Sequence, residues 1–136
     1  MKIDGGCHCG HITYEADVDP ERVVICNCED CQSLSGSAFR SVVFTTDNGF
    51  KLLSGEMKIY LKTGGSGNKR QTSFCPECGS SIYSTSEAGG PVYGIRLGSV
   101  KSEQRGQFVP TKRIFARSEQ AWVDDLPSIP KVQDAS

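Results

Sequence analysis

Apolar residues along the chain alternate with polar ones in short runs, as expected for half-buried β-strands. Most of these runs are rich in β-branched and aromatic residues, and turn-forming groups such as Asp47-Asn48-Gly49 and Ser54-Gly55 follow two of them. The predicted strands are 12–14, 22–25, 39–44, 51–53, 58–61, 81–83 and 92–97. The pattern predicts a mainly β fold, a compact domain of short antiparallel strands with few short helices.

Helical spacing is rare along the chain. The best helix candidates are the short segments 29–34 and 118–121. The sequence contains neither an internal repeat nor a linker, so a single domain spanning 1–136 is expected. Pro127 and Pro130 introduce a polar end, which predicts a loosely ordered tail over 128–136.

Charge and hydropathy exclude some classes of partner. The formal net charge is −1, and a local basic stretch, Lys69-Arg70, is too short to reverse it, so binding to nucleic acid is not expected. The longest apolar run, 23–26, falls far short of the roughly 20 residues that span a bilayer. The N-terminus lacks the apolar stretch of a secretory signal. We therefore expect a cytoplasmic protein with no membrane partner.

Seven cysteines provide the strongest chemical signal in the chain. In a reducing compartment, clustered cysteines bind metal more often than they form disulfides, and zinc is the usual ion. The cysteines form three clusters: Cys7 and Cys9; Cys26, Cys28 and Cys31; and Cys75 and Cys78. Seven thiolates complete one tetrahedral site and leave three ligands for a second, so two zinc ions per chain are predicted.

The first predicted site is closed and structural. Cys75-Pro76-Glu77-Cys78-Gly79 is a zinc-knuckle sequence, in which Gly79 permits a left-handed turn beside the sulfurs. Together with Cys7 and Cys9 it would close a loop of about 66 residues, so that metal binding becomes folding energy. His8 and His11 are expected to be surface residues.

The second predicted site, formed by Cys26, Cys28 and Cys31, has an open position. The fourth ligand would be water, a substrate thiol or a side chain brought in by the fold, and an empty, redox-labile cluster is a further alternative. We favour thiol binding, because three-ligand zinc holds an incoming thiol as a thiolate. Glu29 and Asp30 are expected to be solvated, and the sequence assigns no catalytic acid or base.

Two polar, glycine-containing loops are candidates for holding a ligand through backbone N–H groups. The predicted contacts are Ser35, Gly36, Ser66, Gly67 and Asn68. The loops do not match the phosphate-binding pattern of nucleotide enzymes, so no nucleotide is inferred.

The motifs together resemble the glutathione-dependent formaldehyde-activating enzyme (GFA) family. The resemblance covers about residues 5 to 127 and is carried by 6–10, the Cys26/Cys28/Cys31 spacing followed by Ser35-Gly36, 66–68, 74–79, Gly98-Ser99, Trp122 and the Pro127/Pro130 tail. It implies a zinc-bound β fold shared with Rab exchange-factor-like proteins. It also implies structural zinc on Cys7, Cys9, Cys75 and Cys78, with a second zinc on Cys26, Cys28 and Cys31.

The resemblance further implies carbon–sulfur lyase activity, the formation or cleavage of S-hydroxymethylglutathione from glutathione and formaldehyde. The leading hypothesis is thus an enzyme that acts on a small thiol and an aldehyde. The alternative is a zinc-stabilised β binding module without catalytic activity, which predicts an exposed apolar patch. The sequence does not specify the thiol, the aldehyde or the oligomeric state.

Overall fold

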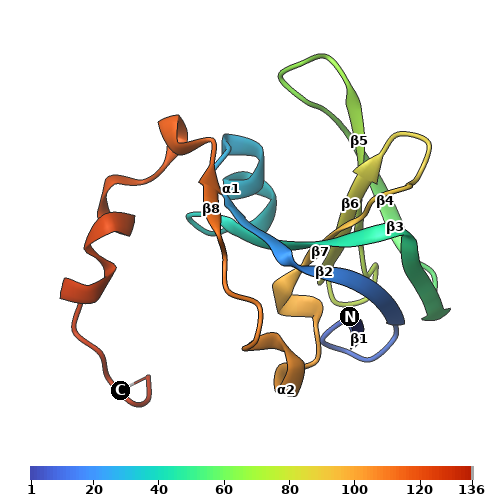
Figure 1. Ribbon diagram of the computed structural model, residues 1–136, viewed down its shortest axis with the longest axis horizontal. Helices are drawn as coiled ribbons and strands as arrows, with labels where there is room; N and C mark the ends of the chain where they lie inside the picture. The colour runs from blue at the N-terminus through green and yellow to red at the C-terminus, as the bar shows by residue number, and fades with distance from the viewer. Residues whose placement is uncertain (136) are drawn as a thin grey trace.

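Two long strands pair with each other in a mainly antiparallel sheet (Figure 1). The computed structural model describes residues 1–135. The strands are β1 (Lys2–Gly6), β2 (Thr13–Cys26), β3 (Arg40–Ser54), β4 (Lys58–Thr63), β5 (Lys69–Phe74), β6 (Ser81–Ser86), β7 (Gly94–Arg96) and β8 (Lys112–Ile114). The prediction of a mainly β fold is confirmed.

The strand order places distant parts of the chain next to one another. The order is β1-β2-β3-β7-β6-β5-β4, and β8 pairs in parallel with the end of β2. All other pairings are antiparallel. The one parallel pair was not predicted, because a three-residue strand carries no periodic signal of its own.

The two long strands, β2 and β3, are longer than the sequence pattern predicts. The predicted turn at 47–49 lies inside β3, where Asn48 has a positive φ of 58°. The pairing of β2 with β3 shifts register between Ala16 and Val18 and again between Val18 and Val23. Turn-forming residues are thus accommodated as bulges within a continuous pair of strands, because cross-strand hydrogen bonds resume on both sides of each bulge.

One face of the sheet packs into the hydrophobic core. The strand registers align Val23 with Val43, Val43 with Ile95, and Ile95 with Tyr83, so these four side chains lie in one row. The three aliphatic residues of the row are completely buried. Because side chains alternate between faces, the residues between them point to the opposite face of the sheet.

Short helices complete the fold. They are α1 (Glu29–Ser35), α2 (Ser102–Arg105), and the 3-10 helices η1 (Leu97–Ser99), η2 (Ala116–Ser118) and η3 (Ala121–Ser128). The predicted helix at 29–34 is confirmed. The segment 118–121 instead contains the last residue of η2, two residues outside any helix, and the first residue of η3. Across the described residues, no helix combines the length and the apolar character needed to cross a membrane.

The C-terminal segment runs from β8 along one side of the molecule, beyond α1 (Figure 1). Within the predicted tail 128–136, Ser128 ends η3, and the residues from 129 to 135 are exposed and lie outside any strand or helix. Residue 136 lies outside the described residues. Loose attachment of this tail stays a prediction.

Candidate functional site

Four cysteines from the two ends of the sheet converge on one point. Cys7 and Cys9 follow β1, and Cys75 and Cys78 lie in the turn between β5 and β6. Their sulfur atoms all lie within 4.8 Å of one another. The Sγ atoms of Cys7 and Cys9 are 3.6 Å apart, and those of Cys9 and Cys75 are 3.8 Å apart. The sequence-based grouping of these four residues is thereby reproduced in space.

The distances fit a tetrahedral zinc ion. Four sulfurs at the usual zinc–sulfur distance of about 2.3 Å are about 3.8 Å apart along the edges of the tetrahedron. Backbone N–H groups of Ile12 and Glu77 donate to the sulfurs of Cys7 and Cys75 at 3.1 and 3.4 Å. Such bonds stabilise thiolates. The four residues can therefore bind a metal ion, because both the kind of donor atom and the distances between the donors suit one.

Ser80 supports this cluster from the side of the turn. Its hydroxyl lies 3.2 Å from the sulfur of Cys78 and accepts a hydrogen bond from the backbone of His8 at 3.0 Å. The hydrogen bond from Ser80 lowers the pKa of the Cys78 thiol to about 5. Gly79 has a positive φ of 80°, as the knuckle sequence predicts. His8 and His11 are exposed and lie outside the cluster.

The second cluster lies where β2 meets α1. Cys26 ends β2, Cys28 is the N-cap residue of α1, and Cys31 lies in its first turn. The backbone N–H of Cys31 donates to the sulfur of Cys28 at 3.3 Å. The three sulfurs lie within 4.8 Å of one another, so these residues can also hold a metal ion. Among residues 1–135, no histidine, carboxylate or further cysteine joins this group.

Two thiols of this cluster, Cys26 and Cys31, have pKa values shifted in opposite directions. A hydrogen bond from Cys26 lowers the pKa of Cys31 to about 5, and the charges of Arg40 and Arg96 act in the same direction. The same hydrogen bond, together with burial, raises the pKa of Cys26 above its ordinary value. Cys31 is therefore the thiolate that forms first, which favours capture of a cation.

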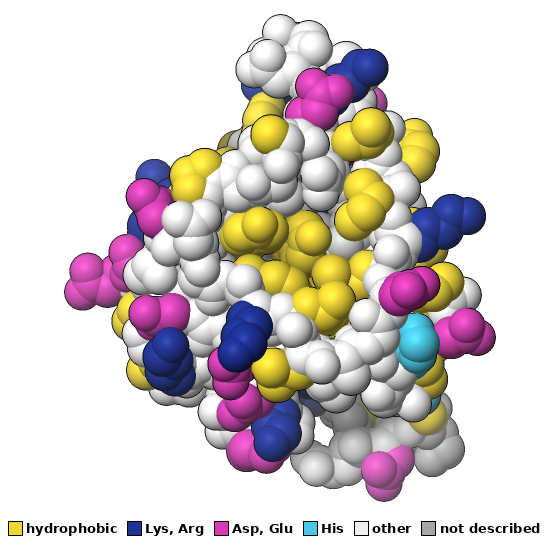
Figure 2. Space-filling view, turned by 90° about the vertical axis from the view of Figure 1, so that its right-hand side faces the viewer, with side chains coloured by type: hydrophobic (Ala, Val, Ile, Leu, Met, Phe, Trp, Pro, Cys, Tyr) yellow, Lys and Arg dark blue, Asp and Glu magenta, His cyan; other side chains and the backbone are white. Residues whose placement is uncertain are grey.

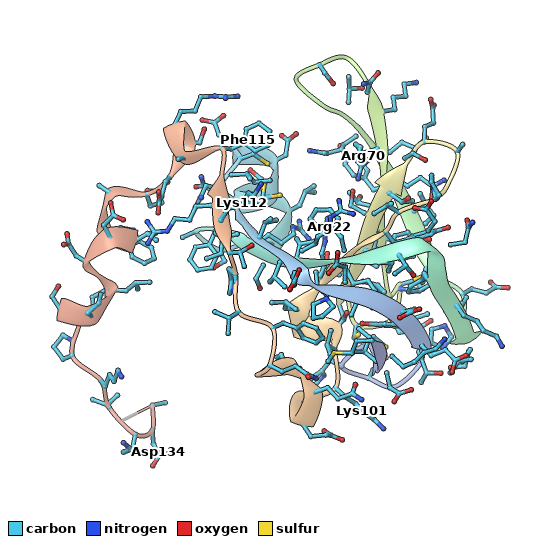
Figure 3. All side chains as sticks on the ribbon, in the orientation of Figure 1. Arg22, Arg70, Lys101, Lys112, Phe115 and Asp134 are labelled. Atoms are coloured by element: carbon cyan, nitrogen blue, oxygen red, sulfur yellow. The ribbon has the colours of Figure 1, made fainter. Side chains whose placement is uncertain are left out.

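The three-cysteine cluster borders a cavity of about 800 Å³. Its floor is the sheet face opposite the core. The rim includes Gly64, Gly65 and Ser66 of the β4–β5 loop and residues of α1. Figure 3 shows Phe115, beside α1, and Arg70, on β5, on either side of this cavity. A small ligand in the cavity would thus reach the cluster directly.

Strand register explains which side chains form the floor. Cys26 pairs with Arg40, and Val42 pairs with Arg96, so these four side chains point to the same face. Arg70, from β5, also lines the cavity. The cationic floor follows from the β2–β3–β7 pairing and was not predicted from sequence. The only signal was one arginine within each of two mainly apolar runs, at 39–44 and 92–97.

The arginines of the floor have incomplete hydrogen bonding. Arg40 is 5% exposed, and its Nη1 donates to Ser81 Oγ at 3.1 Å. Within the described part of the chain, the buried Nε atoms of Arg40 and Arg96 have no hydrogen-bond partner. Burial, with the neighbouring charge of Arg40, lowers the pKa of Arg96 to about 9. These groups are thus arranged to receive an acceptor that residues 1–135 do not provide.

The predicted ligand contacts are only partly brought together. Ser66 lines the cavity beside the three-cysteine cluster, whereas Ser35 lines a second cavity of about 630 Å³. Gly36, Gly67 and Asn68, among the residues described, line neither of these cavities. Gly36 instead ends α1 in the left-handed conformation. Contact of any of these residues with a ligand stays a prediction.

The predicted polar neighbours of the cluster, Glu29 and Asp30, are exposed and line the cavity rim. Asp30 pairs with Lys62 at 2.9 Å. This contact joins α1 to the β4–β5 hairpin across the cavity. Because both side chains are exposed, both carboxylates are in contact with solvent, as expected.

Comparisons with known proteins agree with the fold and the cysteine clusters. A sequence model described as "Glutathione-dependent formaldehyde-activating enzyme" matches residues 2–118. The crystal structure of a Rhodobacter sphaeroides protein, a structural genomics target, superposes with a TM-score of 0.61 at 17% identity. The alignment covers 83% of this chain and 99% of that one, a likeness of fold. No curated protein matches the chain.

Proposed function

Because the chain belongs to the glutathione-dependent formaldehyde-activating enzyme family, we propose that it is a zinc-dependent carbon–sulfur lyase. It would act on a small thiol–aldehyde adduct of the S-hydroxymethylglutathione type, in the cytoplasm. The observation that carries the proposal is the three-cysteine cluster beside a cavity, without a fourth protein ligand among residues 1–135. An open coordination position next to a ligand cavity is typical of a catalytic zinc site.

Cys26, Cys28 and Cys31 would hold the catalytic zinc, which would supply an open position where a thiol binds as a thiolate. The cavity floor would bind and orient the rest of the ligand. Lys62 and Asp30 would hold the β4–β5 hairpin near α1, which limits access of water. Cys7, Cys9, Cys75 and Cys78 would hold a structural zinc.

Cobalt substitution followed by glutathione titration tests this proposal. Two cobalt ions per chain are expected, with glutathione changing the thiolate charge-transfer and d–d bands of one of them. Glutathione and formaldehyde together should then change these bands further, as an adduct forms. A spectrum that no small thiol alters at two cobalts would contradict the enzyme proposal.

One observation favours the alternative, a zinc-stabilised binding module. Large apolar side chains at the end of β3 and along β4 are exposed: Leu52, Leu53, Ile59, Tyr60 and Leu61. Figure 2 views the molecule from the right-hand side of Figure 1 and shows apolar side chains gathered on that face. Replacing Ile59 and Leu61 with Ser should leave thiol-dependent cobalt spectra unchanged if the protein is an enzyme.

A further inference from the structure

Three arginines lie on the floor of the cavity without a carboxylate to pair with among residues 1–135. Arg40 and Arg96 come from adjacent strands, and Arg70 comes from β5. Within residues 1–135, no carboxylate forms an ion pair with any of the three. Of the two acidic residues on the rim, Asp30 pairs with Lys62 and Glu29 is exposed. The cavity is therefore cationic at its base.

Hydrogen-bond donors at this floor point to a missing acceptor. Arg40 is 5% exposed, yet its buried Nε lacks a partner within the described residues, and the same holds for Nε of Arg96. The Nη1 of Arg96 makes only a long bond, 3.4 Å, to the carbonyl of Gly94. Buried charged donors in proteins are normally paired, because an unpaired one loses its hydration without compensation.

The three-cysteine cluster does not neutralise this charge. Three thiolates and one divalent zinc leave a single negative charge, against three positive charges on the arginines. A ligand thiolate would remove one of the two remaining positive charges. One further negative group on the same ligand would make the site neutral.

We propose that Arg40 and Arg96, with Arg70 beside them, form an anion subsite that binds a carboxylate of the ligand whose sulfur is held at the three-cysteine cluster. These arginines would then be the residues that select a thiol with a carboxylate over a neutral thiol of similar size. This inference rests on the proposed function, since it needs the cluster to accept a thiol.

Strand geometry sets the separation of the two groups. Cys26 and Arg40 are directly paired residues of β2 and β3, so their Cα atoms are about 5 Å apart. Arg96 is one strand further and pairs with Val42, on the diagonal from Arg40. A thiol and a carboxylate separated by a short carbon chain would therefore reach both parts of the site. Guanidinium groups suit such a ligand, because they bind carboxylates through two parallel hydrogen bonds.

Isothermal titration calorimetry on the zinc-loaded protein tests the subsite. 3-Mercaptopropionate and its methyl ester have the same thiol, but only the acid has a carboxylate. Wild-type protein should bind the acid at least about tenfold more tightly than the ester. Arg96→Gln should bring this ratio close to one, while Arg113→Gln should retain it, because Arg113 is exposed and outside the cavity. Arg40→Gln provides a second test of the same floor.

Each outcome separates the two proposals. Equal binding of acid and ester to wild-type protein would overturn the anion subsite and leave the thiol site intact. If neither 3-mercaptopropionate nor its methyl ester binds to the wild-type protein, the proposed function itself is overturned. The wild-type comparison needs no variant, so misfolding of an arginine variant does not remove the test. Glutathione and its diethyl ester are measured in parallel. A larger acid-over-ester preference for glutathione than for 3-mercaptopropionate indicates a peptide thiol as the ligand, and the reverse indicates a small mercapto acid.

Discussion

At the scale of single residues, a buried hydrogen-bond chain links the core to the cavity floor. The Tyr14 hydroxyl donates to Ser99 Oγ at 2.8 Å, and Ser99 Oγ donates to the carbonyl of Arg96 at 2.8 Å. Tyr14 is 1% exposed. The backbone of Arg96 is therefore held by the side chains of Ser99 and Tyr14. This fixes the position from which the Arg96 side chain extends toward the cavity.

The first prediction concerns the pH dependence of stability. Burial raises the pKa of Tyr14 to about 12, with its bond to Ser99 acting in the opposite direction. A raised pKa contributes stability that is complete below the unfolded value of about 10 and is lost as pH rises through 12. Across this range, ionisation of Tyr14 should lower the unfolding free energy of the wild type by up to about 3 kcal/mol. Tyr14→Phe should lack this part of the loss.

Urea unfolding at pH 9 and pH 11.5 measures this difference. Tyr60→Phe is the control, because Tyr60 is 53% exposed, and it should follow the wild type. Parallel losses in wild type and Tyr14→Phe would show that Tyr14 is not the residue responsible.

The second prediction concerns Gly5, which packs against the same tyrosine. A Cβ at this position would lie 2.3 Å from the ring of Tyr14 and 2.4 Å from the carbonyl of Ser99. Gly5→Ala should therefore lower the unfolding free energy by about 1–3 kcal/mol. Gly106→Ala, where no atom lies within 4 Å of the added Cβ, should have little effect in the same denaturation experiment.

At the scale of elements, α1 is a seven-residue helix held by its ends and by one side chain. Cys28 caps its N-terminus, and Gly36 caps its C-terminus with a φ of 65°. Gln32 donates from its amide nitrogen to the carbonyls of Asn27 and Ser118, at 2.8 and 2.9 Å. The helix therefore depends on neighbouring segments more than on its own length. This arrangement places two of the three cluster sulfurs.

The third prediction separates the two clusters. In Cys28→Ser, serine should retain the helix cap, so the unfolding free energy should stay within about 1 kcal/mol of wild type while one metal ion is lost. In Cys75→Ser, a buried ligand of the other cluster is removed, and the chain should unfold. Metal analysis and circular dichroism measure both effects. Equal folding of the two variants would contradict the division into structural and open sites.

At the scale of the whole molecule, the four-cysteine cluster joins distant strands of one sheet. β1 lies at one end of the strand order, and β5 and β6 lie near the other end. An isolated bridge between Gly5 and Val100 also connects β1 to the chain after β7. The sheet must therefore curl for its ends to meet. A metal at this point would close that curl.

The fourth prediction concerns metal removal. Partial chelation should remove the ion at the three-cysteine cluster first, since it has one protein ligand fewer, with little change in Tm. Removal of the second ion should lower Tm by about 10 °C or more, because binding energy is folding energy there. Calorimetry at each metal content measures the two steps. A large fall in Tm with the first ion would contradict this order.

Local patterns in the sequence were sufficient for several features of the protein. Alternating apolar residues predict strands because the side-chain period of two is a local property of extended backbone. The helix at 29–34 was predicted, whereas β5, β8 and α2 were not, since their short polar segments acquire structure from their neighbours. Cysteine spacing predicted the three-cysteine cluster and the knuckle turn, because these sulfurs can meet with little help from the rest of the chain. The joining of Cys7 and Cys9 to the knuckle followed from counting ligands, since one tetrahedral site needs four.

The sequence by itself therefore determined the β class, the family and the two cysteine clusters that can hold a metal ion. The tertiary structure alone decided the cavity and its charge. Arg40 lies opposite Cys26 only because β2 and β3 pair in one register, after two bulges, one of which the sequence pattern predicted as a turn at 47–49. A shift of one residue would turn Arg40 to the other face of the sheet. Long-range pairing sets that register, so no local pattern around Arg40 or Arg96 reveals it.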